Sequence, residues 1–182
     1  MDKNKILDIT EDAMQCLDEL SFNHCVNVGN TALLVEKALG LKDTALSSAA
    51  FVHDIGKQYI APMVLYKKGR LTPLEREIVD YHAFYGYKLL SDRGVDMEIC
   101  YIVLYHHGID VKTTHDVKPC LDKKVIAYSR MLHTIDIYCA LTENRPFRGA
   151  LTPKEAISVM EEEPSTLHLP TFEVLKELAK KN

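Results

Sequence analysis

Seven residues with side chains that can bind a metal ion lie in or beside apolar segments of this 182-residue chain. Five are histidines and two are aspartates: His24, His53, Asp54, His82, His106, His107 and Asp136. Imidazole and carboxylate ligands suit Fe, Mn, Co, Ni or Zn better than Ca or Mg. Burying such groups without partners is costly, and coordination removes the cost because each lone pair gains a cation. Together these residue types indicate a metal centre.

Taken singly, each of these residues has a simpler interpretation. A lone histidine in a mostly apolar helix is more often a hydrogen-bonded core residue than a ligand, and an adjacent His-Asp pair arises readily by chance. The double histidine before Gly108 also suits a helix C-terminus, where cationic side chains are favourable. Seven such coincidences on five helical segments are improbable, so we interpret the set as metal-binding.

The segments that carry these residues have the apolar spacing of helices. Apolar residues recur every three or four positions over 24–40, which begins at His24 and ends at Gly40, where a C-cap glycine is expected. The segment 42–57 repeats this pattern, which stops at Gly56, so its helix is expected to close with the His-Asp pair.

Two sequences, TPLE at 72–75 and TPKE at 152–155, have the residues of a helix N-terminus. In each, the threonine can act as N-cap, the proline fits the first helical position, and the glutamate completes a capping box. The first would begin a helix with His82 in its middle. Further helices are expected over 97–107, 122–142 and 170–180, and loops near 60–71, 108–121, 143–151 and 162–169.

Alternation typical of strands is missing, apart from YIAPMVLY at 59–66, which Pro62 interrupts. The expected fold class is therefore all-α, as a single domain over 1–182 with about seven to eight helices. Helices that each carry one or two inward-facing polar residues can bring them together in a bundle core, as in dimetal helical proteins. We expect the metal centre in that core.

Composition narrows the setting in which the protein works. The net charge is −4 and the sequence pI is near 6.1, so no basic field favours long nucleic acid or an anionic membrane. The five cysteines include no CxxC pair, which argues against a disulfide framework and a cysteine zinc site. The N-terminus is too acidic for a signal peptide, and no apolar stretch is long enough to span a membrane. The chain is predicted to be cytoplasmic.

The motifs resemble the HD superfamily of metal-dependent phosphohydrolases, and more narrowly its HD-GYP branch, which degrades cyclic di-GMP. The resemblance runs from about His24 to about Met160. It rests on HDIGK at 53–57, KKGRLTPLE at 67–75, the double histidine, and the segment DIYCALTENRPFR that starts at Asp136. It implies an HD-domain bundle in which one metal is held by His24, His53, Asp54 and Asp136, and a second by His82, His106 and His107, with Asp54 bridging.

The resemblance also implies roles for several basic residues. Lys57 would act beside Asp54 in catalysis and touch a substrate phosphate, and Arg145 and Arg148 would meet phosphate groups. Such a pair of metals can share a hydroxide and clamp both oxygens of an in-line displacement, while the basic groups neutralise the developing charge. Three further basic residues either extend this patch or belong to a solvated loop: Lys67, Lys68 and Arg70.

The sequence departs from the family at three positions. Gly108 stands where the HD-GYP branch has a glutamate, and no Gly-Tyr-Pro follows, so recognition of cyclic di-GMP is left open. Leu20 stands where three-metal members have a glutamate ligand, so two metals are expected. Cys139 replaces a second aspartate, which would leave Lys57 less well oriented.

Other polar residues and the N-terminal segment have less definite interpretations. His133 lies one helical turn before Asp136 and is either a supporting residue of the metal site or a core residue. His115 and His168 are interpreted as loop residues. Cys25 is expected to be a small buried hydrophobe. The amphipathic segment 4–20 would pack on the core or on a second subunit.

Three functions remain open at this point. The first is a phosphodiesterase that hydrolyses a cyclic dinucleotide, such as one like cyclic di-GMP, or a related nucleotide. The second is a degenerate signalling module that binds metal and a nucleotide or protein partner without turnover. The third, di-iron oxygen chemistry, is disfavoured because Lys57, Arg145 and Arg148 suit phosphate.

The first two functions imply the same cofactors and similar partners. The expected cofactors are two divalent metal ions, Fe or Mn first, with Ni, Co and Zn as alternatives. The chain shows no receiver or sensor domain, so regulation is expected from a homo-oligomer, a separate signalling partner or the first 20 residues.

Overall fold

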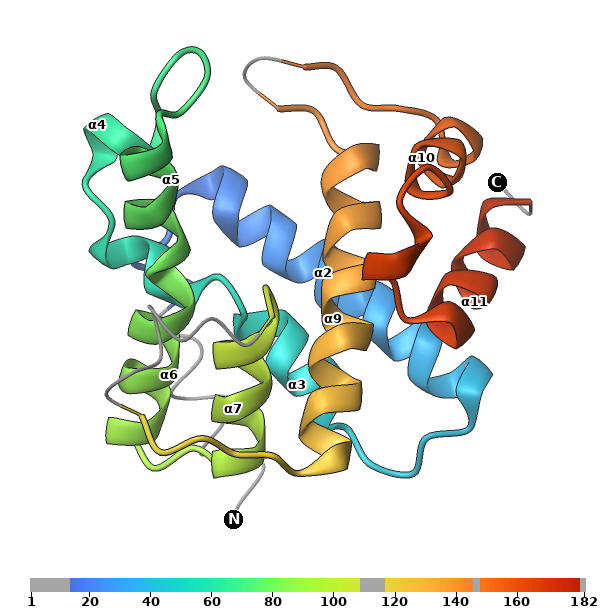
Figure 1. The fold of residues 1–182 in the computed structure, drawn as a ribbon, viewed down its shortest axis with the longest axis horizontal. Coiled ribbons are helices and arrows are strands. Elements are labelled where there is room, and N and C mark those ends of the chain that lie inside the picture. Colours follow the sequence, from blue (N-terminus) through green and yellow to red (C-terminus); the bar gives the residue numbers. More distant parts are fainter. Residues whose placement is uncertain (1–13, 109–116, 146–147, 181–182) are drawn as a thin grey trace.

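The structure, a computed structural model, describes residues 14–108, 117–145 and 148–180. These residues form eight α-helices of eight residues or more, and their only β-structure is an isolated bridge between Arg145 and Arg148. The all-α prediction is confirmed (Figure 1). The longer helices are α2 (Glu19–Leu39), α3 (Ala45–Val52), α5 (Pro73–Asp80), α6 (His82–Asp92), α7 (Met97–Tyr105), α9 (Lys123–Thr142), α10 (Pro153–Met160) and α11 (Leu169–Ala179). Shorter elements are α4 (Pro62–Leu65) and the 3-10 helices η1 (Ile55–Tyr59) and η2 (Pro164–Thr166).

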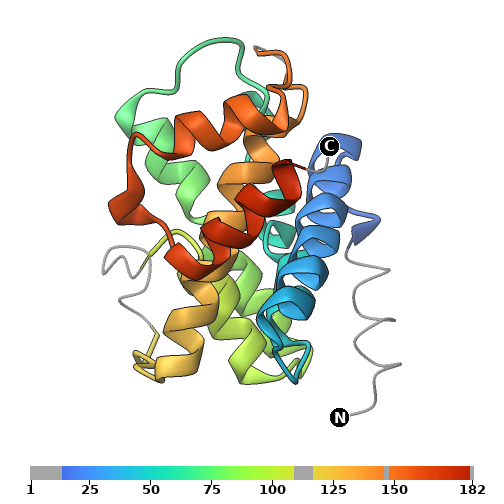
Figure 2. The same ribbon diagram turned by 90° about the vertical axis from the view of Figure 1, so that its right-hand side faces the viewer.

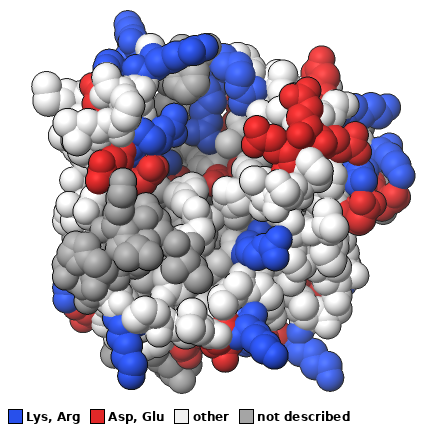
Figure 3. Space-filling model, in the orientation of Figure 1, with Lys and Arg blue, Asp and Glu red and all other residues white. Residues whose placement is uncertain are grey.

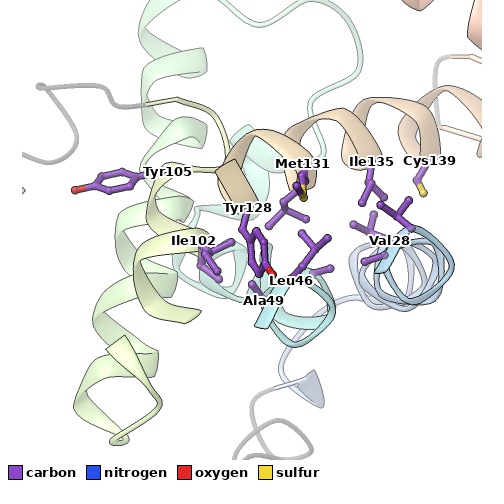
Figure 4. Packing of buried hydrophobic residues seen from close by; sticks show 14 of the residues in the cluster. Val28, Leu46, Ala49, Ile102, Tyr105, Tyr128, Met131, Ile135 and Cys139 are labelled. Carbon is purple, nitrogen blue, oxygen red and sulfur yellow. The ribbon is translucent and has the colours of Figure 1, made fainter. Parts of the chain in front are cut away.

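Helix α9 is the central element of the bundle. It packs against α2, α3 and α7, and also against α10 and α11 on its other side (Figure 1). The turned view shows α11 alongside both α2 and α9 (Figure 2). Met131, Ile135 and Cys139 of α9 point towards α2 and α3, where Val28 and Leu46 face them (Figure 4). These side chains are nearly or wholly inaccessible to solvent, so apolar burial around α9 is the main stabilising contribution.

The helix starts follow the capping signals in the sequence. In both predicted capping boxes, the threonine hydroxyl accepts from the glutamate backbone N–H and the glutamate carboxylate accepts from the threonine backbone N–H, at Thr72 and Thr152. Helix α2 begins at Glu19 rather than at His24, because the Asp18 carboxylate caps the N–H groups of Leu20 and Ser21. The prediction that His24 opens the helix is therefore wrong.

The helix ends near the candidate ligands also differ from the prediction. Helix α3 ends at Val52 instead of Gly56, and His82 begins α6 instead of lying within a longer helix. The helix predicted over 97–107 ends at Tyr105. At all three sites a histidine Nδ1 lies within hydrogen-bond distance of the carbonyl three residues earlier. The last carbonyls of a helix have no backbone N–H partner, and here the histidine side chain provides a donor to one of them. The helix can therefore end at this point.

Some expectations need smaller corrections or fall outside the described ranges. The loop expected near 60–71 contains α4, and α9 and α11 start or end within one residue of the predicted bounds. His168 is the residue before α11, and the predicted loop over 162–169 contains η2. Residues 4–13 of the amphipathic segment, and His115, lie outside the described residues.

The helices were also compared with the requirements of a membrane span. Across 14–108, 117–145 and 148–180, none combines the length and the apolar character that such a span needs.

Candidate metal centre

The fold brings all seven predicted ligands together. Their ligand atoms form three overlapping groups, within each of which every pair of atoms lies within 4.8 Å. The groups are His24, His53 and Asp54; His82, His106 and His107; and His53, His106 and Asp136. His24, His53, Asp54, His82 and His106 are buried, Asp136 is partly buried and His107 is exposed.

Three of the imidazoles are fixed in the orientation that a metal ligand needs. The Nδ1 atoms of His53, His82 and His106 lie 2.8, 2.6 and 2.6 Å from the carbonyl oxygens of Ala50, Val79 and Val103. A carbonyl oxygen only accepts, so each Nδ1 must carry a proton, and in the neutral ring Nε2 then has the lone pair. Hydrogen bonding of one ring nitrogen to a backbone carbonyl is the arrangement that orients metal-binding histidines.

The inward-facing lone pairs provide a direct test of fit. The Nε2 atoms of His82 and His106 lie only 3.3 Å apart, and both are acceptors when the two rings are neutral. Burial lowers the pKa of His106 well below its ordinary value, and the neighbouring histidines lower it further, so its ring stays neutral. Two neutral acceptors at this distance repel each other, whereas a cation between them would attract both. This donor set fits a divalent metal ion.

Asp54 faces two groups of imidazoles at once. Its Oδ1 lies 3.2 Å from His82 Nε2, whereas its Oδ2 lies 3.5 Å from His53 Nε2 and 3.9 Å from His24 Nε2. Burial would raise the pKa of this carboxyl, but Lys57 and the surrounding histidines hold it well below its ordinary value. The carboxylate is therefore ionised, with one oxygen directed to each side.

His24 lies between two carboxylates. Its Nε2 is 2.8 Å from Asp136 Oδ1, and its Nδ1 is 2.8 Å from Glu143 Oε2. Burial lowers the pKa of His24, but these two hydrogen bonds outweigh it and raise the pKa to about 9. Asn27 Nδ2 donates to the other oxygen of Glu143 at 2.8 Å. Glu143 therefore orients His24 from outside the ligand set.

Glu143 was missed by the sequence analysis, although its position held a signal. It lies seven residues after Asp136, two helical turns further along the same face of the chain as it leaves α9. A carboxylate at that spacing could have been expected near the metal ligands.

The ligands open onto a cavity of about 370 Å³ that both basic and acidic side chains line. On the face drawn in Figure 3, Lys and Arg side chains and Asp and Glu side chains both border a hollow. The cavity is lined by four basic residues, by three aspartates and by His82: Lys57, Arg76, Arg145 and Arg148, with Asp54, Asp80 and Asp136. Arg76 was not predicted, although it is three residues before Val79 and six before His82, which both line the same cavity.

The predicted basic residues differ in how they are held. Lys57 Nζ lies 2.5 Å from Asp54 Oδ2. Arg145 Nη2 lies 3.6 Å from Glu143 Oε2. The Arg148 guanidinium donates to the carbonyl oxygens of Leu141, Gly149 and Ala140, so it also satisfies the C-terminal end of α9.

The three basic loop residues Lys67, Lys68 and Arg70 differ in their positions. Lys67 lines a neighbouring cavity and forms an ion pair with Glu75. Lys68 and Arg70 are exposed and line neither of these two cavities.

The structure also shows where the residues that depart from the family pattern lie. Leu20 is 54% exposed and lines the same neighbouring cavity as Lys67. Cys139 is buried, and its thiol lies 3.4 Å from the Thr31 hydroxyl rather than beside Lys57, which is oriented by Asp54. Cys25 is wholly buried, as predicted. Gly108 has a φ of 101°, a left-handed conformation that favours glycine.

His133 lies beside the ligand set without joining its three groups. Its ring makes an edge contact with the His107 ring at a centroid distance of 6.1 Å. Its Nδ1 is buried without a hydrogen-bond partner among the described residues.

Comparison with known proteins places this site in a family. The HD domain model matches residues 21–159. A cyclic di-GMP phosphodiesterase of Pseudomonas aeruginosa is 30% identical over 149 residues, which are 80% of this chain and 36% of that protein. A 3'3'-cGAMP-specific phosphodiesterase of Vibrio cholerae is 29% identical over 132 residues, 71% of this chain and 28% of that protein. The chain thus spans about a third of the length of these relatives.

A solved structure shows the same fold. The HD domain of the L. monocytogenes phosphodiesterase PgpH, in complex with cyclic-di-AMP, superposes with a TM-score of 0.63 at 18% identity. The match covers 87% of each chain. With the family model, the relatives and the convergent histidines and aspartates in agreement, the chain belongs to the HD domain family and is distantly related to HD-GYP cyclic di-GMP phosphodiesterases.

Proposed function

We propose that this chain is a metal-dependent phosphodiesterase that hydrolyses a cyclic dinucleotide, or a related nucleotide, with two divalent cations. One observation carries this proposal: Asp54 directs its two oxygens to two groups of imidazoles in a cavity that four basic residues line. Two neighbouring cations and surrounding basic groups can catalyse phosphodiester hydrolysis. The names of the relatives support a cyclic dinucleotide as substrate.

The ligand sets divide around Asp54. His24, His53 and Asp136 would hold one cation with one oxygen of Asp54, and His82, His106 and His107 would hold the other. Cations bound there would polarise the phosphate and lower the pKa of a water molecule that attacks it. The mixed set of imidazole and carboxylate ligands suits Fe or Mn, with Ni, Co and Zn as alternatives.

The basic residues of the cavity would bind and orient the phosphate. Burial lowers the pKa of Lys57, but the Asp54 carboxylate outweighs it and raises the pKa above its ordinary value, so the ammonium keeps its proton. Lys57 would donate from the Asp54 side of the cavity. Arg145, from the segment after α9, and Arg76, from α5, would donate to non-bridging phosphate oxygens, and Arg148 would add its charge from the wall.

A second candidate function is a module that binds metal and a nucleotide without turnover. The observation that favours it is Gly108, which provides no side chain after the double histidine where the HD-GYP branch has a glutamate. The position of Lys57 beside Asp54 favours catalysis instead, because the lysine is oriented despite the substitution at Cys139.

One experiment distinguishes the phosphodiesterase from the binding module. Protein loaded in turn with Mn, Fe, Co, Ni or Zn is assayed with bis(4-nitrophenyl) phosphate and with a panel of cyclic dinucleotides. The phosphodiesterase hydrolyses at least one of them, and hydrolysis ceases with chelator. Tight binding of a cyclic dinucleotide without hydrolysis under every metal would instead establish the binding module.

A further inference from the structure

A second cavity, of about 250 Å³, adjoins the metal-site cavity. It lies between the first half of α2 and the segment that follows α4, and the end of α9 contributes its third side. His24, Lys57 and Arg145 line both cavities. A single molecule could therefore lie across the two, with one part at the metal ligands and another part in the second cavity.

The second cavity has an aromatic side. The Tyr66 ring is 50% exposed and lines it. Burial and the neighbouring carboxylate of Asp18, the N-cap of α2, raise the pKa of the Tyr66 hydroxyl. Both residues line the cavity, so the segment after α4 faces the start of α2 there.

The opposite side carries amides. Asn23 and Asn27 are four residues apart, so they lie on the same face of α2, and both line the cavity. Asn27 Nδ2 donates to Glu143 Oε1 at 2.8 Å, which fixes the direction of its amide. Asn144 follows Glu143 and lines the same cavity.

Two arginines distinguish the cavities. Arg76 and Arg148 line only the metal-site cavity, where cations would also neutralise the charges of Asp54 and Asp136. A second phosphate in the second cavity would instead face the carboxylates of Asp18 and Glu143, and Lys67 already forms an ion pair with Glu75. The phosphate is therefore placed beside Arg76 and Arg148, and a neutral ring in the second cavity.

We propose that this second cavity is a nucleobase subsite, in which the Tyr66 ring stacks on one base of the substrate and the Asn23 amide reads its edge. Bases are commonly recognised by aromatic stacking combined with amide hydrogen bonds to their edges. The volume is below the about 300–1,000 Å³ of sites for drug-sized ligands, so it suits one base and not both bases of a dinucleotide. The subsite rests on the proposed function because it takes the phosphate to lie at the metal ligands.

The test uses two substrates that share a leaving group. Metal-loaded protein is assayed with methyl 4-nitrophenyl phosphate and with the 4-nitrophenyl esters of the four common nucleoside 5′-monophosphates. The wild type should prefer at least one nucleoside ester, measured as the ratio of its kcat/KM to that of the methyl ester. In Tyr66→Ala this ratio should fall about tenfold, mostly through KM, because stacking on the base is lost. Asn23→Ala should change which base is preferred.

Matched variants separate the subsite from general surface effects. Tyr59→Ala removes a tyrosine of similar exposure that does not line the cavity, and Asn30→Ala removes an exposed asparagine of the same helix. Neither should change the ratio. Tyr66→Phe keeps the ring and should retain most of the preference. The subsite would be overturned if the wild type preferred no nucleoside ester over the methyl ester. It would also be overturned if the ratio of the two kcat/KM values were the same in Tyr66→Ala as in the wild type.

Failure of the proposed function gives a different result, in which no ester is hydrolysed under any metal. The subsite is then decided by calorimetric titration of the same protein with nucleoside 5′-monophosphates and with inorganic phosphate. Tighter binding of a nucleotide than of phosphate, lost in Tyr66→Ala, supports the subsite. Equal binding of the two overturns it.

Discussion

At the scale of single residues, the Asp54 carboxylate is the link between the two groups of imidazoles. Its two oxygens lie within 3.2–3.9 Å of Nε2 atoms on both sides, and its ammonium neighbour Lys57 lines the substrate cavity. An amide in its place would keep the size of the side chain but lose the charge that two cations share. The variant Asp54→Asn therefore isolates the electrostatic contribution.

Asp54→Asn should bind less metal per chain and lose more than about 100-fold in phosphodiesterase rate, because even a residue that only orients a metal-binding histidine contributes about 10–100-fold. Metal analysis by mass spectrometry and the esterase assay measure the two effects. Asp92→Asn, an exposed residue paired with Lys88, provides the control and should match the wild type. Full metal content in Asp54→Asn would contradict the bridging position.

Glu143 contacts the candidate metal centre through His24. Glu143→Gln keeps the contact with Asn27 within reach but removes the charge that faces His24 Nδ1. Metal affinity should fall about 10- to 100-fold in a competition titration with a chromophoric chelator. Glu77→Gln, an exposed glutamate of α5, should leave the affinity unchanged. Equal metal affinities in Glu143→Gln and the wild type would show that Glu143 does not support metal binding.

The same pair predicts a pH dependence in the metal-free protein. Hydrogen bonds to Asp136 and Glu143 outweigh burial and raise the pKa of His24 from 6.5 to about 9. A raised pKa stabilises the folded state fully below pH 6.5, and this stabilisation is lost as the pH rises through about 9. Wild type should therefore exceed Glu143→Gln in free energy of unfolding near pH 6, and the difference should shrink towards pH 10. Denaturant titrations across this range measure it, and a constant difference would contradict the ion pair.

At the scale of helices, the site depends on where α3, α5 and α7 end. Each of these helices stops at or just before a histidine that bonds back to a carbonyl of its last turn. The η1 segment then brings Gly56 against the start of α6. A Cβ at Gly56 would lie 2.0 Å from the His82 carbonyl oxygen and 2.5 Å from the Gly86 nitrogen, both of them backbone atoms. The close approach of η1 and α6 thus positions Asp54 beside His82.

Gly56→Ala should force η1 away from α6 and destabilise the fold by at least about 1–3 kcal/mol, the usual cost of overpacking. Urea unfolding measures the change in midpoint, and metal affinity should fall in parallel because the two groups of ligands move apart. Gly149→Ala is the matched control, since its Cβ would meet no atom within 4 Å and its φ is not in the left-handed region. Similar stability of Gly56→Ala and Gly149→Ala would contradict the close approach.

The sequence predicted the helix boundaries that have a local sequence signal better than the other boundaries. The capping boxes at Thr72 and Thr152 are local and could be recognised directly. The ends of α3 and α7 depend on histidine side chains bonding to backbone carbonyls, which apolar spacing does not reveal. Likewise, Arg76 and Glu143 reach the site from segments whose relative placement is set by packing around α9, so periodicity alone did not identify them.

At the scale of the whole molecule, the metal centre joins segments from most of the chain. Its predicted ligands come from α2, from the residues between α3 and η1, from the start of α6, from the residues after α7 and from α9. Five of the seven side chains are buried, so the folded state holds polar groups close together away from solvent. A cation that binds there favours the folded state over the unfolded chain, in which the ligands are dispersed.

Metal binding should therefore raise the stability of the whole fold. At a free metal concentration of 100 Kd, the free energy of unfolding should increase by about 2.7 kcal/mol. Calorimetric melting with and without Mn²⁺ measures this as a higher Tm, and chelator should reverse it. In Asp54→Asn the shift should be much smaller. A wild-type Tm indifferent to every divalent metal would show that the buried imidazoles are stable without a cation.

The most direct measurement is anomalous X-ray scattering from crystals grown with the bound metal. The account predicts two anomalous peaks, one against His24, His53 and Asp136 and the other against His82, His106 and His107, with Asp54 reaching both. A single peak, or peaks only at the protein surface, would contradict the claim that this cluster holds a pair of cations.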